Sequence, residues 1–417
     1  MEQKNVVILG AGFAGVSAAR TLAKKIKYSH LKNSVKIFLI DKHEYQTFTP
    51  FLYKVATTSK RIAGANFPDL INYKIDEIIG SLPITFIQSE ISEINLKNNL
   101  VNGSAGSVPF DYLVLALGSE ANFFNIPGLK ENSLPFKSYR DALAIRDSIW
   151  NLALEGNEKI KIIIGGGGPS GVELAGRLAN FSSELNQEFR NIQLDITIID
   201  ASENILSGLH PHLIYLAKQR LKQLKIKILT ESPIISVKNK EVFLASGQLP
   251  FDILIWTGGV KPNHLISNLP FKYHRSGRIE VNKTFQCRLE SQIKTEAKLY
   301  AVGDVCCFYN RQDKPVPQIV RIAIKEGEIA ALNIFENLKL KKSTKVIRHF
   351  IYIPKNYPTI LTIGEKFTLA QINTIVLKGC YARMLKSLVE LHYLISIMPS
   401  FKAIEHWLSG FIIRNRK

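Results

Sequence analysis

Two short glycine patterns stand out as residues whose spacing predicts a chemical role. Each has three glycines spaced G-x-G-x-x-G behind a short apolar run: Gly10, Gly12 and Gly15, and Gly166, Gly168 and Gly171. In such a pattern the first glycine permits a tight turn, the second lets a pyrophosphate approach the backbone, and the third lets a helix pack closely on the strand. The phosphates then lie at the free N–H groups of the helix N-terminus. The spacing therefore predicts two strand–turn–helix units that hold a dinucleotide.

Each glycine pattern is followed by an acidic residue at the end of a second apolar run. These residues are Asp41 and Asp200. A carboxylate at this place accepts hydrogen bonds from a ribose 2′-hydroxyl and repels a 2′-phosphate. Related segments then close the two units: FDYLVLALGS at 110–119, with Gly118, and FDILIWTGGV at 251–260, with Gly258. Two copies in the same order indicate a duplicated Rossmann-like unit.

Two dinucleotide sites in one chain suggest two dinucleotides held face to face. FAD with NADH is the economical pair, because hydride passes from a nicotinamide to a flavin. The segment KLYAVGDVCCF at 298–308 supports the flavin. Its Asp304 ends a short apolar strand, where a carboxylate can hydrogen-bond the ribityl and pyrophosphate part of FAD.

The alternation of strands and helices predicts an α/β fold with mostly parallel sheets. We expect an FAD-binding domain in two parts, residues 1–120 and 259–345. The NAD(H)-binding domain, residues 121–258, would be inserted between them. Residues 346–417 would form a C-terminal membrane-association region with amphipathic helices.

Composition narrows the class of partner. The chain has 54 Lys and Arg against 35 Asp and Glu, a net charge of +19, which indicates either an anionic partner or only a Lys-rich proteome. No nucleic-acid-binding motif stands out, so an anionic membrane is the favoured partner and nucleic acid is not expected. The four cysteines lack C-x-x-C spacing, so neither a redox disulfide nor a metal site is indicated.

Hydropathy predicts a protein that is made and kept in one compartment. No apolar run reaches the ~18 residues that span a bilayer. The first strand begins so close to Met1 that no signal peptide is expected.

A helical pattern begins at Tyr381 and is interrupted at Pro399. Apolar residues share one face in each half, and we expect Lys386, Lys402 and Glu405 to face away from it. A basic, amphipathic helix pair can lie in the plane of a membrane interface. The alternative is that these helices dock on the protein body or on a second subunit.

This ordered set of segments resembles the type II NADH dehydrogenases, single-chain flavoproteins with two dinucleotide-binding domains. The similar segments cover nearly the whole chain and include DKHEYQTFTPFLYKVATTS at 41–59, GGGGPSGVELAG at 165–176, WTGGVKPN at 256–263 and YAVGDV at 300–305. The tail CYARMLKSLVELHYL is similar to the family's amphipathic membrane anchor.

The resemblance implies a non-proton-pumping NADH:quinone oxidoreductase that passes hydride from NADH to FAD and then two electrons to a membrane quinone. No protein nucleophile is implied. The protein would be peripheral, on the cytoplasmic face of the inner (plasma) membrane, and a homodimer is one assembly open to it. The residues implied for FAD are Gly10, Gly12, Gly15, Asp41, Pro50, Thr57, Gly118 and Asp304. Those implied for NADH are Gly166, Gly168, Gly171, Glu173, Asp200 and Gly258.

Three positions depart from the family pattern. Arg321 and Lys325 stand where the family has two glutamines around the quinone head, and Arg177 stands where it has a second carboxylate. These changes leave open an FAD-dependent pyridine-nucleotide reductase with a non-quinone acceptor. A non-enzymatic flavoprotein on the membrane surface is a further alternative, against which the intact glycines and acidic residues argue.

Overall fold

The structure is a computed structural model. It describes residues 3–59, 71–290, 298–340, 349–354 and 357–415, with side chains described up to residue 408. Parts of the predicted C-terminal region lie outside this description, namely residues 346–348, 355–356 and 416–417.

The first of two five-stranded sheets contains the N-terminal glycine unit. All of its strand pairs are parallel, in the order β21 (Lys298–Ala301), β9 (Tyr112–Leu115), β1 (Lys4–Leu9), β2 (Val35–Asp41) and β5 (Thr85–Gln88). Helix α1 (Phe13–Lys27) connects β1 to β2, and α8 (Val320–Lys339) packs along it. A Cβ on Gly327 of α8 would lie 2.2 Å from the carbonyl oxygen of Ala14, so the two helices touch through their backbones.

The second sheet repeats this arrangement. Its parallel order is β11 (Leu134–Pro135), β18 (Ile253–Trp256), β12 (Lys159–Gly165), β13 (Gln193–Ile199) and β14 (Lys227–Leu229). Its helices are α5 (Tyr139–Leu154), α6 (Pro169–Leu185) and α7 (Pro211–Gln223). In each sheet the glycine-turn strand lies between the strand that carries the acidic residue and the strand that follows a Phe-Asp pair.

The Phe-Asp pairs have the same contact in both sheets. The Asp111 carboxylate accepts a hydrogen bond from the backbone N–H of Asn5 at 2.8 Å, and Asp252 accepts one from Lys161 at 2.7 Å. Each aspartate thus fixes the start of the neighbouring glycine-turn strand. The duplication predicted from the sequence is confirmed down to this detail.

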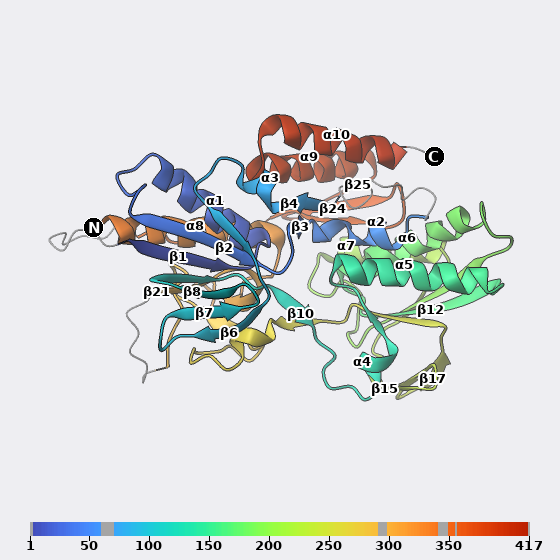
Figure 1. The fold of residues 1–417 in the computed structure, drawn as a ribbon. Coiled ribbons are helices and arrows are strands. Elements are labelled where there is room, and N and C mark those ends of the chain that lie inside the picture. The colour runs from blue at the N-terminus through green and yellow to red at the C-terminus, as the bar shows by residue number, and fades with distance from the viewer. Residues whose placement is uncertain (1–2, 60–70, 291–297, 341–348, 355–356, 416–417) are drawn as a thin grey trace.

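The second sheet is inserted into the first, as predicted. Strand β21 pairs with β9 although the whole second sheet lies between them in sequence. The chain crosses between the two lobes through β10 (Ser119–Ala121) and β19 (Val260–Pro262), which pair antiparallel. Figure 1 shows the two lobes side by side with β10 between them.

The C-terminal part forms a small antiparallel sheet and two helices. The sheet contains β23 (Thr359–Thr362), β24 (Thr368–Ile372) and β25 (Ile375–Lys378), and α9 (Cys380–Ile397) and α10 (Ser400–Asn415) follow. In Figure 1 these helices lie across the top of both lobes. The indole N–H of Trp407 donates to the carbonyl oxygen of Ser387 at 3.1 Å and ties α10 to α9. Within the described residues, the helices are all too short or too polar to cross a membrane.

The remaining elements are short. They are β3 (Tyr45–Thr47), η1 (Thr49–Phe51), α2 (Leu52–Ala56), β4 (Asn72–Lys74), α3 (Ile75–Ile79), β6 (Ile91–Asn95), β7 (Leu100–Gly103), β8 (Gly106–Pro109), α4 (Leu129–Asn132), β15 (Ile234–Lys238), β16 (Glu241–Leu244), β17 (Gly247–Pro250), η3 (His264–Ile266), β20 (Ile279–Glu280), η4 (Gly303–Val305) and β22 (Cys306–Cys307).

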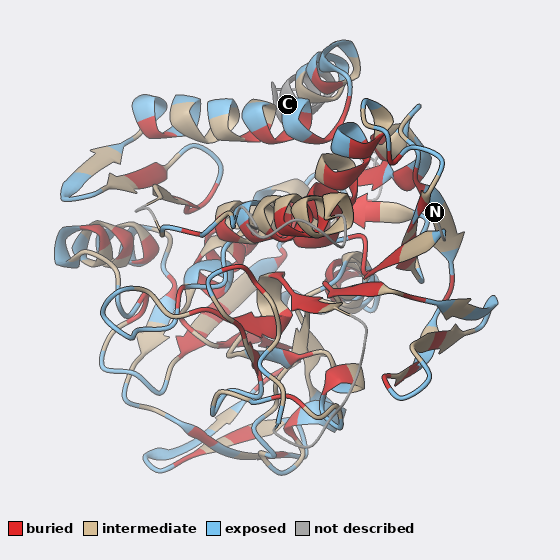
Figure 2. Cartoon of the chain, turned by 90° about the vertical axis from the view of Figure 1, so that its left-hand side faces the viewer, coloured by how far each residue is buried: buried red, intermediate tan, exposed pale blue. Residues whose placement is uncertain are grey.

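The apolar core runs through both parallel sheets. Residues 6–9 of β1 and the whole of β9 and β18 are buried, because helices and loops cover both faces of each sheet. Figure 2 shows the buried residues concentrated in the strands and on the inward sides of the helices. The sheets therefore hold the glycine turns rigidly at their carboxyl ends.

Candidate dinucleotide and electron-transfer site

The first glycine of each pattern holds a tight turn against a neighbouring strand. Gly10 has φ of 100° and Gly166 has φ of 113°, in the region that favours glycine. A Cβ on Gly10 would lie 2.3 Å from the carbonyl oxygen of Ala116, and one on Gly166 would lie 2.6 Å from the Cα of Gly258. Both Gly258 and the segment before Gly118 thus border the turns.

The second and third glycines repeat the same geometry in both units. A Cβ on Gly12 or Gly168 would meet nothing within 4 Å, so each faces open space. A Cβ on Gly15 would lie 1.8 Å from the Gly10 carbonyl oxygen, and one on Gly171 would lie 2.0 Å from that of Gly166.

The open space lies at the start of α1 and of α6. The N–H groups in the first turn of a helix have no acceptor within that helix, and they attract anions. A side chain at the second glycine would fill this space, so the residues present fit a pyrophosphate in both units.

The two acidic residues brace these turns. Asp41 accepts from the N–H groups of Ala11 at 2.7 Å and His43 at 2.9 Å. Asp200 accepts from those of Gly167 at 2.5 Å and Ser202 at 2.7 Å. A carboxylate has about four acceptor positions, so each aspartate can still accept from ribose hydroxyls. The bracing of the turn is a role that the sequence pattern did not predict.

Asp304 lies beside the first glycine turn. A Cβ on the preceding Gly303 would lie 3.1 Å from the Cβ of Ala14 in α1. The Asp304 carboxylate accepts from the Ser119 hydroxyl and from the Lys137 ammonium group, the latter at 3.3 Å. Sequence reasoning missed both partners. Ser119 ends a segment already singled out, whereas nothing local marks Lys137.

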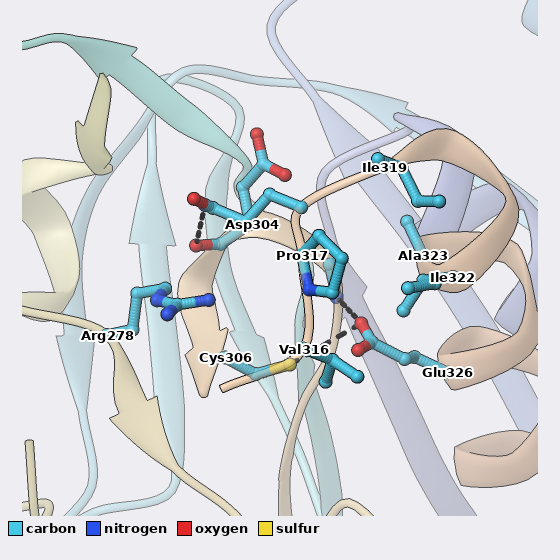
Figure 3. A pocket seen from close by; sticks show the side chains of 11 residues that line it. Arg278, Asp304, Cys306, Val316, Pro317, Ile319, Ile322, Ala323 and Glu326 are labelled. Atoms are coloured by element: carbon cyan, nitrogen blue, oxygen red, sulfur yellow. Dashed lines mark hydrogen bonds between the residues drawn. The ribbon is translucent and has the colours of Figure 1, made fainter. Parts of the chain in front are cut away.

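A small pocket opens next to Asp304, between η4, residues 316–319 and α8. Its side chains are drawn in Figure 3. Glu326 lines it and is only 4% exposed. The Glu326 carboxylate accepts from the N–H of Gly303 at 2.6 Å and from the thiol of Cys306 at 3.4 Å. Burial, with a further contribution from Asp304, raises the pKa of Glu326 to about 7. Sequence reasoning missed this carboxyl as well.

Thr57 and Pro50 lie in the segment that follows Asp41. Pro50 is half-buried in the short helix η1, and Thr57 is fully buried at the end of α2. The Thr57 hydroxyl donates to the Tyr53 carbonyl oxygen at 2.8 Å and accepts from Nε of Arg177 at 3.3 Å. This segment of the first lobe therefore meets α6 of the second lobe.

Arg177 has two carboxylates for neighbours. Its guanidinium lies 3.6 Å from Glu184 of α6 and 3.8 Å from Glu365 in the turn between β23 and β24. Arg177 thus connects both lobes to the C-terminal sheet.

Glu173 is held by the C-terminal part of the chain. Its Oε1 accepts from the ammonium group of Lys386 at 2.9 Å and from the N–H of Thr362 at 2.9 Å. Lys386 also donates to the Tyr53 hydroxyl at 3.1 Å and to Oγ1 of Thr362 at 2.9 Å. Burial alone would lower the pKa of Lys386, but Glu173 and Tyr53 outweigh it and raise that pKa above its usual value.

The sequence pattern places Lys386 on the side of its helix away from the apolar face, and the structure turns Lys386 toward the protein body. The Lys386 side chain is only 17% exposed and points toward Glu173 on α6. The helix pattern marks the apolar residues of α9, but it contains no information about a carboxylate in the other lobe.

The two cations expected in the quinone region lie on α8. The Arg321 guanidinium lies 5.8 Å from the centre of the Tyr357 ring, and Lys325 pairs with Glu328 at 2.5 Å. Arg321 thus contacts the segment that leads into the C-terminal sheet. Gly118 accepts a hydrogen bond from the N–H of Asn263 at 3.2 Å where the chain crosses between the lobes.

The chain is similar to known proteins in sequence. A family model described as "Pyridine nucleotide-disulphide oxidoreductase" matches residues 4–327. The type II NADH:quinone oxidoreductase of Staphylococcus epidermidis is 26% identical over 403 residues, which are 93% of this chain and 94% of that one. The demethylphylloquinone reductase NdbB of Synechocystis is 27% identical over 342 residues, 80% of this chain and 79% of that one.

The fold is shared with a solved structure. NDH2 from Plasmodium falciparum, solved in complex with NADH, has a TM-score of 0.82, with 99% of this chain and 98% of that one covered. At 18% identity this likeness shows the fold alone. Together with the sequence relatives, it confirms the resemblance that the ordered segments indicated.

Proposed function

Because the chain belongs to the pyridine nucleotide-disulphide oxidoreductase family, we propose that it is an FAD-dependent NADH:quinone oxidoreductase that does not pump protons. One observation carries this proposal. The two glycine turns have the same geometry, and each has an open space at the start of a helix and its own acidic residue. Each turn with its open space is called a cradle below. FAD, when bound, accepts hydride from NADH and passes two electrons to an acceptor. The chain itself binds and orients the two dinucleotides.

The first cradle holds FAD. The N–H groups at the start of α1 bind its pyrophosphate in the space left by Gly12, and Asp41 accepts from its ribose. Asp304 and its partner Lys137 bind the ribityl part. Pro50 and Thr57 lie beside the flavin ring, and the other residues of this site are Gly10, Gly15 and Gly118.

The second cradle holds NADH. The start of α6 binds the pyrophosphate, and Asp200 accepts from the adenosine ribose and disfavours a 2′-phosphate. Glu173, which Lys386 orients, lies one turn further along α6 and faces the junction between the lobes. The other residues of this site are Gly166, Gly168, Gly171 and Gly258.

The two proposed dinucleotide sites lie in separate domains. We place the FAD-binding domain at residues 1–120 and 259–345, the NADH-binding domain at 121–258, and the membrane-association region at 346–417. The pairing of β21 with β9 supports the split of the first domain.

The membrane-association region attaches the protein to an anionic membrane without crossing it. Apolar residues on α9 and α10 that are 43% to 69% exposed support this: Tyr381, Met384, Leu388, Ile395, Phe401, Ile404 and Leu408. The net charge of +19 adds an attraction to anionic lipids. We place the protein on the cytoplasmic face of the inner (plasma) membrane, where a homodimer can also form.

A non-quinone acceptor is the second candidate, and the cations of α8 favour it. Arg321 and Lys325 stand at the positions where glutamines are expected around a quinone head. Lys325 is paired with Glu328, so Arg321 is the residue of the two that favours an anionic acceptor over a neutral one.

Anaerobic flavin kinetics test the proposal. The purified protein is reduced with NADH and mixed with a short-chain quinone in detergent, while the visible flavin band is followed. Fast reoxidation supports the quinone reductase. Rapid reduction with sluggish reoxidation would favour the second candidate, and Arg321→Gln with Lys325→Gln should then restore fast reoxidation. A protein that is purified without flavin and binds none would refute both.

A further inference from the structure

A buried carboxyl lies directly beneath the proposed FAD site. Glu326 accepts from the N–H of Gly303 at 2.6 Å, and Gly303 in turn borders Ala14 in the first turn of α1. Figure 3 shows the Glu326 carboxylate pointing toward Cys306 and the pocket that it shares with Asp304 and Arg278. Glu326 has no role in hydride or electron transfer as proposed above.

Few charges surround Glu326. The groups that face it are Asp304 of η4, Cys306 and Cys307 of β22, Arg278 before β20, and Tyr352 from residues 349–354. On the side of α1, Gly303 and Gly327 border Ala14, which is uncharged. Burial raises the pKa values of both thiols and of the tyrosine, so these groups are neutral near pH 7. One anion, Asp304, and one cation, Arg278, remain.

Bound FAD would change this balance. Its pyrophosphate adds negative charge at the start of α1, next to Gly303 and Asp304. Like charges disfavour the ionised form of a carboxyl, and solvent screens poorly at a buried position. With a pyrophosphate held at the start of α1, negative charge would be added to that of Asp304 near Glu326, and Arg278 would be the cation that opposes it.

We infer that Glu326 takes up a proton from solvent when FAD binds, so that this chain releases FAD more readily as the pH rises. The inference rests on the proposed function, since it requires FAD in the first cradle. Glu326 is a positioning residue, because in its neutral form it holds Gly303 and thereby Asp304 without repelling the cofactor.

The direction in which the Kd for FAD changes with pH follows from the pKa of Glu326 without FAD and in the FAD complex. Without FAD, burial raises the pKa of Glu326 to about 7. We expect the negative charge of bound FAD to raise that pKa further. Below about pH 7 the carboxyl is already protonated, and affinity is independent of pH. Above it each binding event takes up one proton, so the Kd for FAD rises by up to about tenfold per pH unit. The rise ends where the pH passes the pKa of the complex.

Equilibrium dialysis of the full-length chain against FAD, from about pH 6 to about pH 9, tests this. Glu326→Gln keeps an oxygen that accepts from Gly303 but cannot titrate. Glu328→Gln is the matched control, since Glu328 lies on the same helix but is 34% exposed and pairs with Lys325. We expect the Kd to rise with pH in the wild type and in Glu328→Gln, and to stay nearly flat in Glu326→Gln.

A second variant tests the same group without removing it. The Cys306 thiol donates to the Glu326 carboxylate and lowers its pKa, so Cys306→Ala should move the onset of the rise to higher pH. Titration calorimetry in two buffers of different ionisation enthalpy counts the protons taken up on binding.

The outcomes separate this inference from the proposed function. If the Kd for FAD depends on pH in the same way in the wild type and in Glu326→Gln, the inference is overturned, although FAD binding itself is still supported. If Glu326→Gln does not fold, Cys306→Ala decides. The inference is overturned if the Kd for FAD begins to rise at the same pH in Cys306→Ala as in the wild type and no proton is taken up above about pH 7. A wild type that binds no FAD at any pH would refute the proposed function and the inference together.

Discussion

Replacement of Lys386 by methionine should destabilise the protein strongly, and by an amount that depends on pH. The side chains of Lys386 and Glu173 are 17% and 13% exposed, and their charged atoms lie 2.9 Å apart. Methionine keeps much of the side-chain volume but removes the cation. It leaves Glu173 in a largely buried place, with Thr362 as its remaining partner.

The size of the effect has an upper limit. Loss of one partner of a buried ion pair costs about 3–5 kcal/mol. In the variant, Glu173 avoids being a buried, unpaired charge if it binds a proton. The free energy needed to protonate a carboxyl of ordinary pKa is about 4 kcal/mol at pH 7 and about 2 kcal/mol at pH 5.5. We therefore expect a loss of about 3–4 kcal/mol at pH 7. The stranded carboxyl has a raised pKa, so its destabilising contribution disappears as the pH falls toward the unfolded-state value.

Urea unfolding at both pH values measures this loss, with Lys402→Met as the control. Lys402 lies on α10 and pairs with Glu77 at 3.4 Å, but these side chains are 35% and 34% exposed. Such a pair contributes under about 1 kcal/mol. The double variant Lys386→Met with Glu173→Gln should recover much of the loss, because no charge is then stranded. A loss that is equal at both pH values and is not recovered in the double variant would refute the reasoning.

Three further predictions concern the nucleotide, the lobe junction and the membrane. Asp200→Ala should narrow the preference for NADH over NADPH, measured as the ratio of kcat/KM values, because the carboxylate that repels a 2′-phosphate is gone. Arg177→Glu should lower Tm more at pH 8 than at pH 5, because it adds an anion beside Glu365 in place of its cation. Met384→Ser with Leu388→Ser should weaken binding to anionic vesicles at least tenfold at unchanged FAD content, since each buried side chain contributes about 1.5–3 kcal/mol. Co-sedimentation measures that binding.

Much of the fold was predictable because parallel strands are buried on both faces and therefore continuously apolar. The run 162–164 in β12, for example, is entirely apolar and ends at glycines that permit a tight turn, so both the position of the strand and its connection to the next helix follow from the residues. The three-stranded sheet β6–β7–β8 gave no such signal. Its strands mix exposed and half-buried residues in short runs with polar side chains.

The site was predictable where its geometry is local. The glycine turns and the Gly303-Asp304 strand end carry their conformation within a few residues. Glu326 and Lys386 act on partners 23 and 213 residues away in sequence, and no periodicity links them. A glutamate on a helix is usually solvated, so the sequence offered no reason to single out Glu326.

The case of Lys386 also bears on how α9 meets its surroundings. Residues 382, 386 and 390 follow one another at intervals of four, and the structure turns this face inward with Lys386 paired to Glu173. The apolar side chains of Tyr381, Met384 and Leu388 point outward and are 52% to 69% exposed. A period of 3.6 identifies the faces of a helix but not which one faces water. Because the face with Lys386 is turned inward, these apolar side chains lie on the outer side of α9, and they belong to the surface that we propose to bind a membrane.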